Sequence, residues 1–326
     1  MLRVTPLYGS CGHHPNSESI ALPPTSTLIE YGGVKVLVNV GWDESFSAAT
    51  GSGGGDDGNG NASIPPRALP AADVVLITDS TLPALGGLPI YYGKSSRRQG
   101  QADVPPIYGT YPTVKMGQMT VYDLHATASL DGGDPGFTLG DVDGLFGSES
   151  FRTLKYSQTL TMTDRGRAHD PNDPESGKPA LGITPHRAGH VVGGVFWVLR
   201  RLADETEVVV APTYHHARER HLDSATLHKF GAAADVLITR PGGPGGPLGG
   251  LYSAGRVRRK AILTSPSVGR DEGEFVETVM AALRRGGNVL CPVDASGRVL
   301  ELLLVLSSHW DRHRLGSACE LTYRTV

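Results

Sequence analysis

The sequence is poor in cysteine, in aromatic residues and in long apolar runs. Only three of its 326 residues are cysteines, and they lie far apart at Cys11, Cys291 and Cys319. This number and spacing exclude a disulfide framework and a cysteine-rich zinc finger, and they are typical of a protein from a reducing compartment. No apolar run approaches the roughly 20 residues that cross a bilayer. The sequence therefore predicts a soluble intracellular protein without a membrane partner.

An excess of positive charge is also missing. The formal net charge is −3 at pH 7, which excludes a strong, unspecific attraction of the whole surface to nucleic acid. A contact with RNA would need a local site, and two sets of residues are candidates for RNA binding. One is a dense basic cluster, and the other is a turn between a predicted strand and a predicted helix, where backbone amides can receive a phosphate. Their members are Arg256, Arg258, Arg259 and Lys260 for the cluster, and Ser296 and Arg298 for the turn.

Glycine and proline are abundant, with 43 and 23 residues, and much of this excess lies in four polar stretches. The stretches lack the apolar residues whose burial offsets the entropy of ordering a chain. We therefore expect four flexible surface insertions, at Gly51–Pro66, Asp131–Gly136, Asp164–Pro179 and Pro241–Gly250.

Short apolar runs separated by glycine-rich turns dominate the first 240 residues and predict β-sheets. The predicted strands are Ser26–Glu30, Val34–Asn39, Val74–Thr78, Ile107–Gly109, Leu181–Thr184, Val191–Leu199, Glu207–Ala211 and a buried strand at Val236–Thr239. Helices are predicted at Pro112–Leu124, Thr138–Phe146 and Ser224–Phe230.

The pattern then changes to a strict alternation of strand and helix. Lys260–Thr264 and Asn288–Val293 are predicted strands, and each precedes a predicted helix. We expect Asp271 to cap the first helix, and the second is predicted at Val299–His309. This change predicts a domain boundary near residue 240 within an α/β protein.

Seven segments, taken in their order along the chain, resemble a known family. They include Ala-Gly-His-Val-Val-Gly-Gly and a long run that contains Ser-Gly-Arg-Val-Leu-Glu-Leu. The segments are Val40–Glu44, Val114–Leu124, Phe137–Asp143, Leu154–Gln158, Ala188–Gly194, Arg218–Leu222 and Gly287–Leu302. With them the sequence resembles subunit 2 of the cleavage and polyadenylation specificity factor, a pseudo-nuclease relative of that factor's endonuclease subunit.

The resemblance implies a metallo-β-lactamase αββα sandwich into which an α/β β-CASP domain is inserted. Residues 1–240 would form the metallo-β-lactamase-like domain, without its C-terminal part. Residues 241–326 would form the start of the β-CASP-like domain. Because the sequence stops inside this second part, we expect it to be a truncated, N-terminal fragment of a longer protein.

The resemblance also identifies the positions at which active relatives hold two zinc ions. The four ligand positions of their His-x-His-x-Asp-His signature correspond here to Asp79, Thr81, Pro83 and Ala84. The other positions correspond to Asn39, His190, Thr213 and Arg240. Pro83 and Ala84 offer no donor atom, and a neutral threonine hydroxyl is a weak ligand for zinc. The resemblance thus implies a vestigial pocket with no catalytic residue, no metal and no cofactor.

Histidines elsewhere in the sequence leave one alternative open. His215, His216 and His221, together with His186 and His190, would make a rearranged zinc site, as in an active zinc-dependent RNA endonuclease with relocated metal ligands. The spacing counts against this site. Adjacent histidines diverge in direction, and the separation of His216 from His221 suits neither one helix face nor a zinc hairpin.

The function that the resemblance implies is that of a non-catalytic scaffold subunit in nuclear pre-mRNA 3′-end cleavage and polyadenylation. Its partners would be the nuclease subunit of the cleavage and polyadenylation factor and a symplekin-like scaffold, with pre-mRNA bound as part of the complex. An RNA-binding module that uses the emptied groove is a further alternative.

Overall fold

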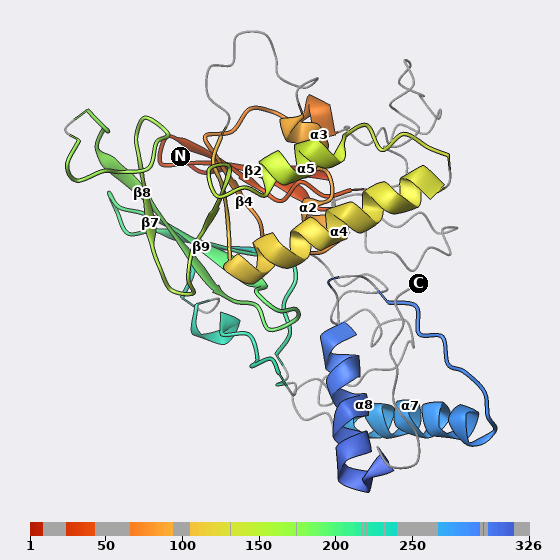
Figure 1. Cartoon of the computed structure of the whole chain (residues 1–326). Helices are drawn as coiled ribbons and strands as arrows, with labels where there is room; N and C mark the ends of the chain where they lie inside the picture. The colour runs from red at the N-terminus through yellow and green to blue at the C-terminus, as the bar shows by residue number, and fades with distance from the viewer. Residues whose placement is uncertain are drawn as a thin grey trace, which may run out of the picture.

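Two β-sheets packed face to face form the centre of the computed structural model (Figure 1). The structure describes residues 1–8, 24–42, 66–93, 105–130, 132–173, 175–216, 218, 221–230, 233–239, 267–293, 296 and 299–315. In this part of the chain, no helix is both long and apolar enough to cross a membrane.

The first sheet has six strands that are neighbours in sequence order. They are β1 (Arg3–Tyr8), β2 (Ser26–Tyr31), β3 (Val34–Val38), β4 (Val74–Leu76), β5 (Ile107–Gly109) and β6 (Phe151–Thr153). The first three pair antiparallel, whereas β3, β4, β5 and β6 pair parallel. The carboxyl ends of these four parallel strands therefore meet at one edge of the sheet, where side chains from distant segments can converge.

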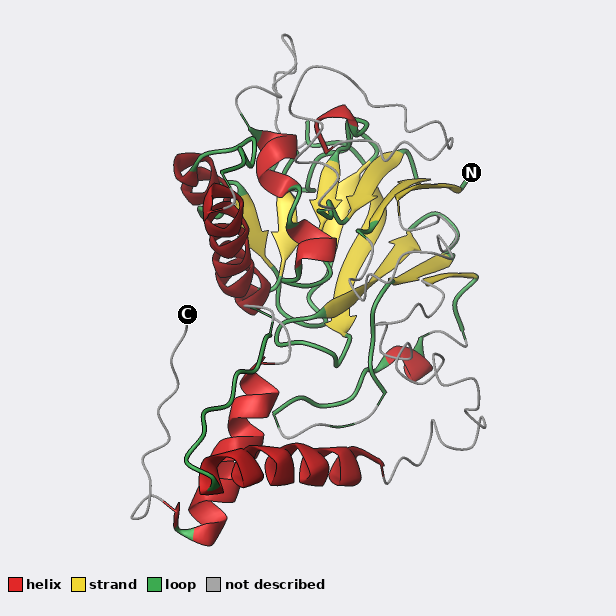
Figure 2. Cartoon of the chain, turned by 90° about the vertical axis from the view of Figure 1, so that its right-hand side faces the viewer, coloured by secondary structure: helices red, strands yellow, loops and turns green. Residues whose placement is uncertain are grey.

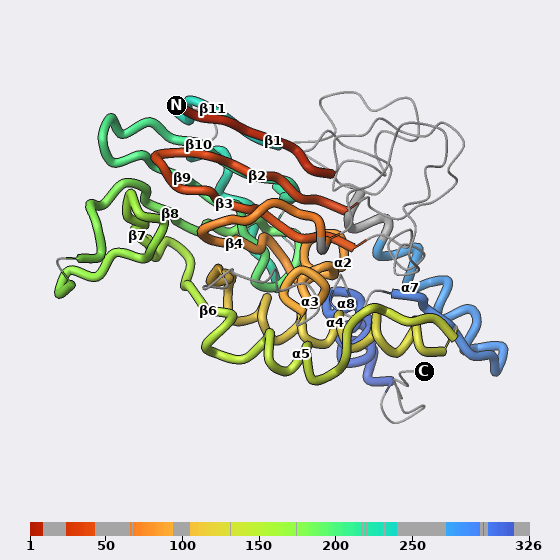
Figure 3. Tube along the Cα trace, turned by 90° about the horizontal axis from the view of Figure 1, so that it is seen from above, coloured from red at the N-terminus to blue at the C-terminus, as the bar shows by residue number. Residues whose placement is uncertain are grey.

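The second sheet has five strands in the order β11 (Val236–Thr239), β10 (Glu207–Ala211), β9 (Val195–Arg201), β8 (Pro179–Arg187) and β7 (Leu160–Thr163). Its strands pair antiparallel except β10 and β11, which pair parallel. The two sheets pack face to face, and their strands overlap in the view from above (Figure 3).

Alternation along the strands produces two apolar layers. On β3, Val36 and Val38 face the second sheet, where they join a core that contains Trp197, while Leu37 between them faces the helices. All of these side chains are almost fully buried, and each such burial stabilises the fold by about 1.5–3 kcal/mol. Among the described residues, the space between the two sheets is thus filled by an apolar core.

Helices cover the outer face of the first sheet (Figure 2). They are the short helices η1 (Pro66–Ala68), α2 (Leu82–Leu85) and α3 (Leu88–Tyr92), and the longer α4 (Tyr111–Leu130) and α5 (Leu139–Leu145). A capping box fixes the start of α5, because Thr138 and Asp141 each accept a hydrogen bond from the other's backbone amide. The outer face of the second sheet is covered in part by η3 (Leu227–Lys229).

Two further helices, α7 (Ser267–Arg284) and α8 (Val299–His313), lie beside the sandwich rather than within its layers (Figure 1). They pack on each other through Val279, Leu306 and Trp310, which form a small apolar cluster of their own.

Most predicted elements are confirmed, and the differences have physical reasons. The helix predicted at Pro112–Leu124 extends over Tyr111–Leu130. The strand predicted from Val191 begins only at Val195, because residues 191–194 form a turn. The prediction that Val236–Thr239 is buried is wrong, since β11 is an edge strand whose residues alternate between half-buried and exposed.

Two predictions for the C-terminal region are also wrong. Asp271 does not cap a helix, because α7 begins earlier, at Ser267. Asn288–Val293 is not a strand among the described residues: it has no regular structure, and Leu290 is 82% exposed. The apolar pattern of this segment is typical of a strand, but a strand also needs a pairing partner.

The four predicted insertions have different outcomes. Most of the first and all of the last lie outside the described residues, as does the strand predicted at Lys260–Thr264. The segment Asp164–Pro179 is a surface hairpin that returns from β7 to β8, and its backbone is hydrogen bonded from Asp164 N to Lys178 O and from Thr163 N to Arg167 O. These bonds connect the two arms of the hairpin, and the flexibility of the segment stays a prediction.

Candidate functional site at the carboxyl ends of the parallel strands

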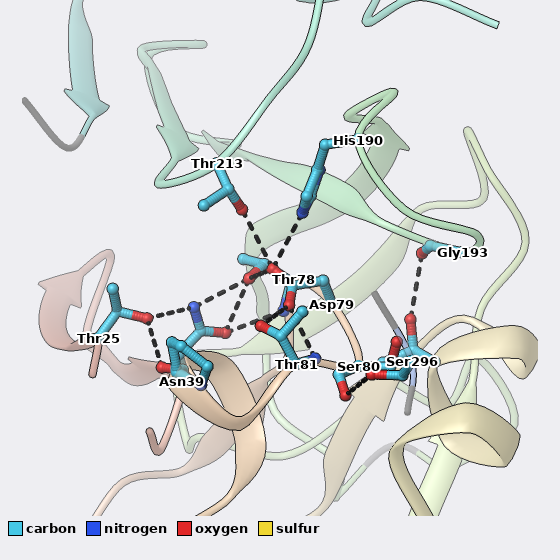
Figure 4. Close-up of polar contacts among 12 residues, drawn as sticks. Thr25, Asn39, Thr78, Asp79, Ser80, Thr81, His190, Gly193, Thr213 and Ser296 are labelled. Atoms are coloured by element: carbon cyan, nitrogen blue, oxygen red, sulfur yellow. Dashed lines mark hydrogen bonds and ion pairs between the residues drawn. The ribbon is translucent and has the colours of Figure 1, made fainter. Parts of the chain in front are cut away.

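A buried carboxylate, that of Asp79, is the centre of the candidate site (Figure 4). Asp79 follows β4 and is only 2% exposed. Its Oδ1 accepts hydrogen bonds from the backbone amide and the hydroxyl of Thr81. Its Oδ2 accepts from the hydroxyls of Thr78 at 3.0 Å and Thr213 at 3.1 Å, and from His190 Nε2 at 3.3 Å. Both carboxylate oxygens are thus saturated with protein donors. We call these five residues the Asp79 cluster.

The donors lower the pKa of Asp79 in spite of its burial. Burial is the largest single influence and by itself raises the pKa, because it disfavours the charged form. The hydrogen bond and the charge of His190, together with the hydrogen bonds of Thr81, outweigh burial and lower the pKa from 3.8 to about 2. Asp79 is therefore an ionised carboxylate at neutral pH, held in place by hydrogen bonds.

Asn39 extends this network to the neighbouring strand end. It follows β3 in a left-handed conformation with φ of 64°, which asparagine tolerates better than most residues. Its Oδ1 accepts from the amide of Thr78 at 2.9 Å, and its Nδ2 donates to the hydroxyls of Thr78 and Thr25, both at 2.9 Å. The side chain thus ties β3 to β4 and to the segment before β2.

Pro83 and Ala84 contribute through their backbones. The carbonyl of Pro83 accepts from the amide of Thr25 at 2.8 Å, and that of Ala84 accepts from the amide of Val40 at 2.8 Å. Only a glycine fits at position 41, in the loop after β3, because a Cβ on Gly41 would lie 2.2 Å from the Pro83 carbonyl oxygen. Helix α2 is therefore packed directly on the loop after β3, with no side-chain donor pointing into the site from either position.

The loop that carries His190 is fastened on one side to α4. The hydroxyls of Thr110 and Thr113 both donate to the carbonyl of Gly193, at 2.7 and 3.1 Å. Gly193 has φ of 80°, and a Cβ there would meet the Thr110 hydroxyl at 2.6 Å. The loop is thereby held so that the His190 ring points at Asp79 (Figure 4).

The donor set does not fit a zinc centre. Within the Asp79 cluster, Asp79 and His190 are the carboxylate and the imidazole, whereas the other three residues offer neutral hydroxyls. A catalytic zinc ion needs three protein ligands and an open position. Throughout the described residues, no group of three or more histidine, cysteine or acidic side chains is placed to hold a metal ion.

The structure separates the histidines of the rearranged site. His190 contacts Asp79, whereas the ring of His186 packs against those of Phe196 and Phe230 on the outer face of the second sheet. His221 Nδ1 is paired with the carboxylate of Glu301 on α8. His216 packs against the ring of Tyr214, and burial, aided by the charge of His228, lowers the pKa of His216.

Of the residues predicted to bind RNA, the structure describes one. Ser296 is fully buried, and its hydroxyl donates to the carbonyl of Ser80 at 2.7 Å. A buried hydroxyl that is used in this way is not available to a phosphate. Arg256, Arg258, Arg259, Lys260 and Arg298 lie outside the described residues, as does Arg240 of the vestigial pocket.

Two residues of the network could not be found from the resemblance. Thr25 and Thr78 occupy none of the metal-ligand positions, yet both hydroxyls bond Asn39. A threonine next to the end of a strand is also common without any such role, so the sequence carried no signal for Thr25 or Thr78.

Comparison with known proteins identifies the family of the chain. Residues 28–242, more than half of the chain, match the model of the metallo-β-lactamase superfamily domain. The chain belongs to the metallo-β-lactamase superfamily, which confirms the fold predicted for this part of the sequence.

The chain is also similar to proteins named as subunits of a cleavage and polyadenylation specificity factor or as a cleavage factor protein. It is 31% identical over 93% of its length to the probable cleavage and polyadenylation specificity factor subunit 2 of Drosophila melanogaster, covering 34% of that protein. It is 30% identical over 95% of its length to subunit 2 of the same factor from Arabidopsis thaliana, again covering 34%. It is 30% identical over 86% of its length to cleavage factor two protein 2 of Schizosaccharomyces pombe, covering 29%. The resemblance predicted from the motifs is confirmed, and the chain spans about a third of the length of these relatives.

Proposed function

We propose that this chain is part of a non-catalytic subunit of the nuclear machinery that cleaves and polyadenylates pre-mRNA. The similarity to subunit 2 of the cleavage and polyadenylation specificity factor in an insect and in a plant supports membership in that machinery. The Asp79 cluster supports the non-catalytic role.

The observation that carries the proposal is the saturation of Asp79 by protein donors. In a two-metal hydrolase, bridging carboxylates hold two cations roughly 4 Å apart, and the cations activate water and stabilise the leaving oxygen. Here the hydroxyls of Thr78, Thr81 and Thr213 and the His190 imidazole already occupy the acceptor sites of the carboxylate. In our proposal, the hydrogen bonds of the cluster connect the strand ends that metal ions connect in a two-metal hydrolase, so the fold needs no metal.

A scaffold acts through its partners. We infer that these are the nuclease subunit of the cleavage and polyadenylation factor and a symplekin-like protein, with pre-mRNA bound in the complex. Within such a complex, the surface around the Asp79 cluster would position the partner rather than cleave RNA. Contacts of the basic residues between 256 and 260 with RNA stay a prediction.

An RNA cleavage assay tests the non-catalytic role. The purified chain is incubated with a labelled single-stranded RNA and with added zinc or manganese, beside the variants Asp79→Asn and His190→Ala. We expect no cleavage that depends on the metal and on these two residues. Metal-dependent cleavage that either variant abolishes would contradict the proposal and favour the active endonuclease.

Affinity purification tests membership in the machinery. The protein, tagged at its own chromosomal locus, is recovered from nuclear extract, and the bound proteins are identified by mass spectrometry. We expect the nuclease subunit among the recovered proteins. A tagged protein that is abundant in the nucleus and recovers no subunit of the machinery would overturn the assignment.

A further inference from the structure

A group of basic side chains lies where α7 and α8 pack on each other. Helix α7 packs across the carboxyl-terminal half of α8 (Figure 1), and the apolar cluster that the two helices share fixes their contact. Arg284 lies in the last turn of α7, and His309, Arg312 and His313 lie near the end of α8. We call these four residues the α7–α8 basic group.

The members of this group lie close enough to act on one another. The rings of His309 and His313 have centroids 4.3 Å apart, and their planes are inclined by 40°. Partial burial, followed by the charges of the other three members, lowers the pKa of His309 from its ordinary value of 6.5. The ring of His309 is therefore neutral at pH 7, and the two arginines supply the positive charge beside it.

No carboxylate balances this charge among the described residues. Neither Arg284 nor Arg312 forms an ion pair there, and both are exposed. Asp311 is two positions from each histidine of α8 and therefore faces another side of the helix. The carboxyl ends of both helices carry partial negative charge, which lets basic side chains gather here without a carboxylate. The positive charge thus stays available to an anion from outside.

The chemistry of the group fits single-stranded RNA. Arginine binds phosphate through its fork of N–H donors, and exposed aromatic rings, imidazole included, are surfaces on which unpaired bases stack. An acidic peptide would use the arginines and leave the pair of rings without a role.

We propose that the α7–α8 basic group is a binding site for single-stranded RNA. Arg284 and Arg312 bind the phosphates, and the rings of His309 and His313 stack on the bases. This inference rests on the proposed function, in which pre-mRNA is bound in the complex. It adds a site distinct from the basic residues between 256 and 260.

Binding of a labelled oligouridine to the purified chain tests the arginines. Fluorescence anisotropy gives the dissociation constant at several salt concentrations. The variant Arg284→Gln, Arg312→Gln is compared with Lys115→Gln, Lys178→Gln, which removes the same charge at exposed positions of the sandwich. Urea unfolding of each variant shows that it is folded.

We expect the arginine variant to bind about tenfold more weakly at low salt than the parent, whereas the lysine control stays within about twofold. The slope of log Kd against log salt should fall by about 1.4, since each lost phosphate contact of a single strand removes about 0.7. Equal losses for the two variants, or a parent that does not bind oligouridine, would overturn the site.

The rings are tested separately. His313→Ala should weaken binding of oligouridine about tenfold without a change in the salt slope, because it removes stacking and no phosphate contact. His228→Ala, at an exposed position of η3, is the matched control. An abasic strand should bind the parent and His313→Ala equally well. Polyglutamate that displaces oligouridine at equal charge, together with no effect of His313→Ala, would overturn RNA binding and indicate an acidic protein partner.

The outcome is independent of membership in the machinery. A protein that recovers the nuclease subunit from nuclear extract, but whose RNA affinity does not depend on the α7–α8 basic group, would refute this site alone. A protein that binds oligouridine through the group and recovers no subunit would refute the proposed function alone.

Discussion

Two regions of the molecule contain the residues considered as metal ligands, and they are built in opposite ways. The Asp79 cluster has one carboxylate and several donors that converge on it. The segment from residue 213 to 228 has four histidines, at His215, His216, His221 and His228. The side chains of His216 and His221 point to different partners, Tyr214 and Glu301.

The difference shows what a metal centre requires besides ligand atoms. In the first region the residues converge, but most of them are hydroxyl donors that satisfy the carboxylate. In the second region the residue types suit zinc, but their geometry disperses them. A metal ion needs both at one point, and in the described part of the chain neither region provides both. The following predictions test this contrast, in order of decreasing effect.

Removing the charge at the centre of the first region should have the largest effect. Asp79→Asn replaces an acceptor oxygen by an NH₂ group that faces the donors of His190 and Thr213 or of Thr81. We expect the free energy of unfolding to fall by about 2–3 kcal/mol, as for a buried group left with mismatched partners. Urea unfolding at pH 7 measures it, with Asp123→Asn on the exposed side of α4 as control. A loss no larger than that of the control would mean that the network is not stabilising.

Acid should remove the same contribution without mutation. The folded-state pKa of Asp79 is about 2 and its ordinary value 3.8. Because the pKa is lowered on folding, the stabilisation is fully present above about pH 4 and is lost as the pH falls toward 2. Its size is about 2 kcal/mol. Unfolding curves from pH 5 to pH 2 should therefore drop less steeply for Asp79→Asn than for the parent. Parallel curves would contradict the lowered pKa.

A single hydroxyl donor should matter less. Thr213→Val keeps the shape of the side chain and removes its hydrogen bond to Asp79 Oδ2. We expect a loss of about 1–2 kcal/mol in the free energy of unfolding, typical of a bond to a charged group. Thr159→Val is the matched control, because Thr159 is exposed and its hydroxyl bonds only the neutral hydroxyl of Thr184 among the contacts that the structure describes. Equal losses for the two variants would remove Thr213 from the network.

The smallest effect is expected in the second region. His216→Ala removes an imidazole that contacts Tyr214 and, by our account, no metal. The free energy of unfolding should change by less than about 1 kcal/mol, and the addition of zinc or a chelator should shift it no further. A variant that loses a zinc-dependent stabilisation of the parent would show that relocated ligands act here.

The fold could be predicted in the regions where periodicity is strong. The strands β2 to β5 and β8 to β10 follow apolar runs that are long enough to be recognised. Strand β1 was missed because half of its residues are polar or proline. Strands β6 and β7 were missed because half or more of their residues are polar. Asn288–Val293 shows the converse error, an apolar run with no strand pairing among the described residues.

The site could be predicted as a set of positions but not as a network. The resemblance placed Asn39, Asp79, Thr81, His190 and Thr213 together, and the structure brings them into one hydrogen-bonded group. Which atoms bond, and that Asp79 is saturated, depends on rotamers and on the approach of two loops. Those are set by tertiary packing, which a single sequence does not report.

The zinc content of the purified chain tests the central claim most directly. Protein produced in zinc-supplemented medium and dialysed against metal-free buffer is analysed by elemental mass spectrometry, beside the variant Thr81→His, Pro83→Asp, Ala84→His. We predict well under one zinc per molecule for the parent, and no metal-dependent RNA cleavage by the triple variant, because Thr213 still supplies no bridging carboxylate. Stoichiometric zinc that survives dialysis of the parent, and is lost on changing His190 or His216, would contradict the account.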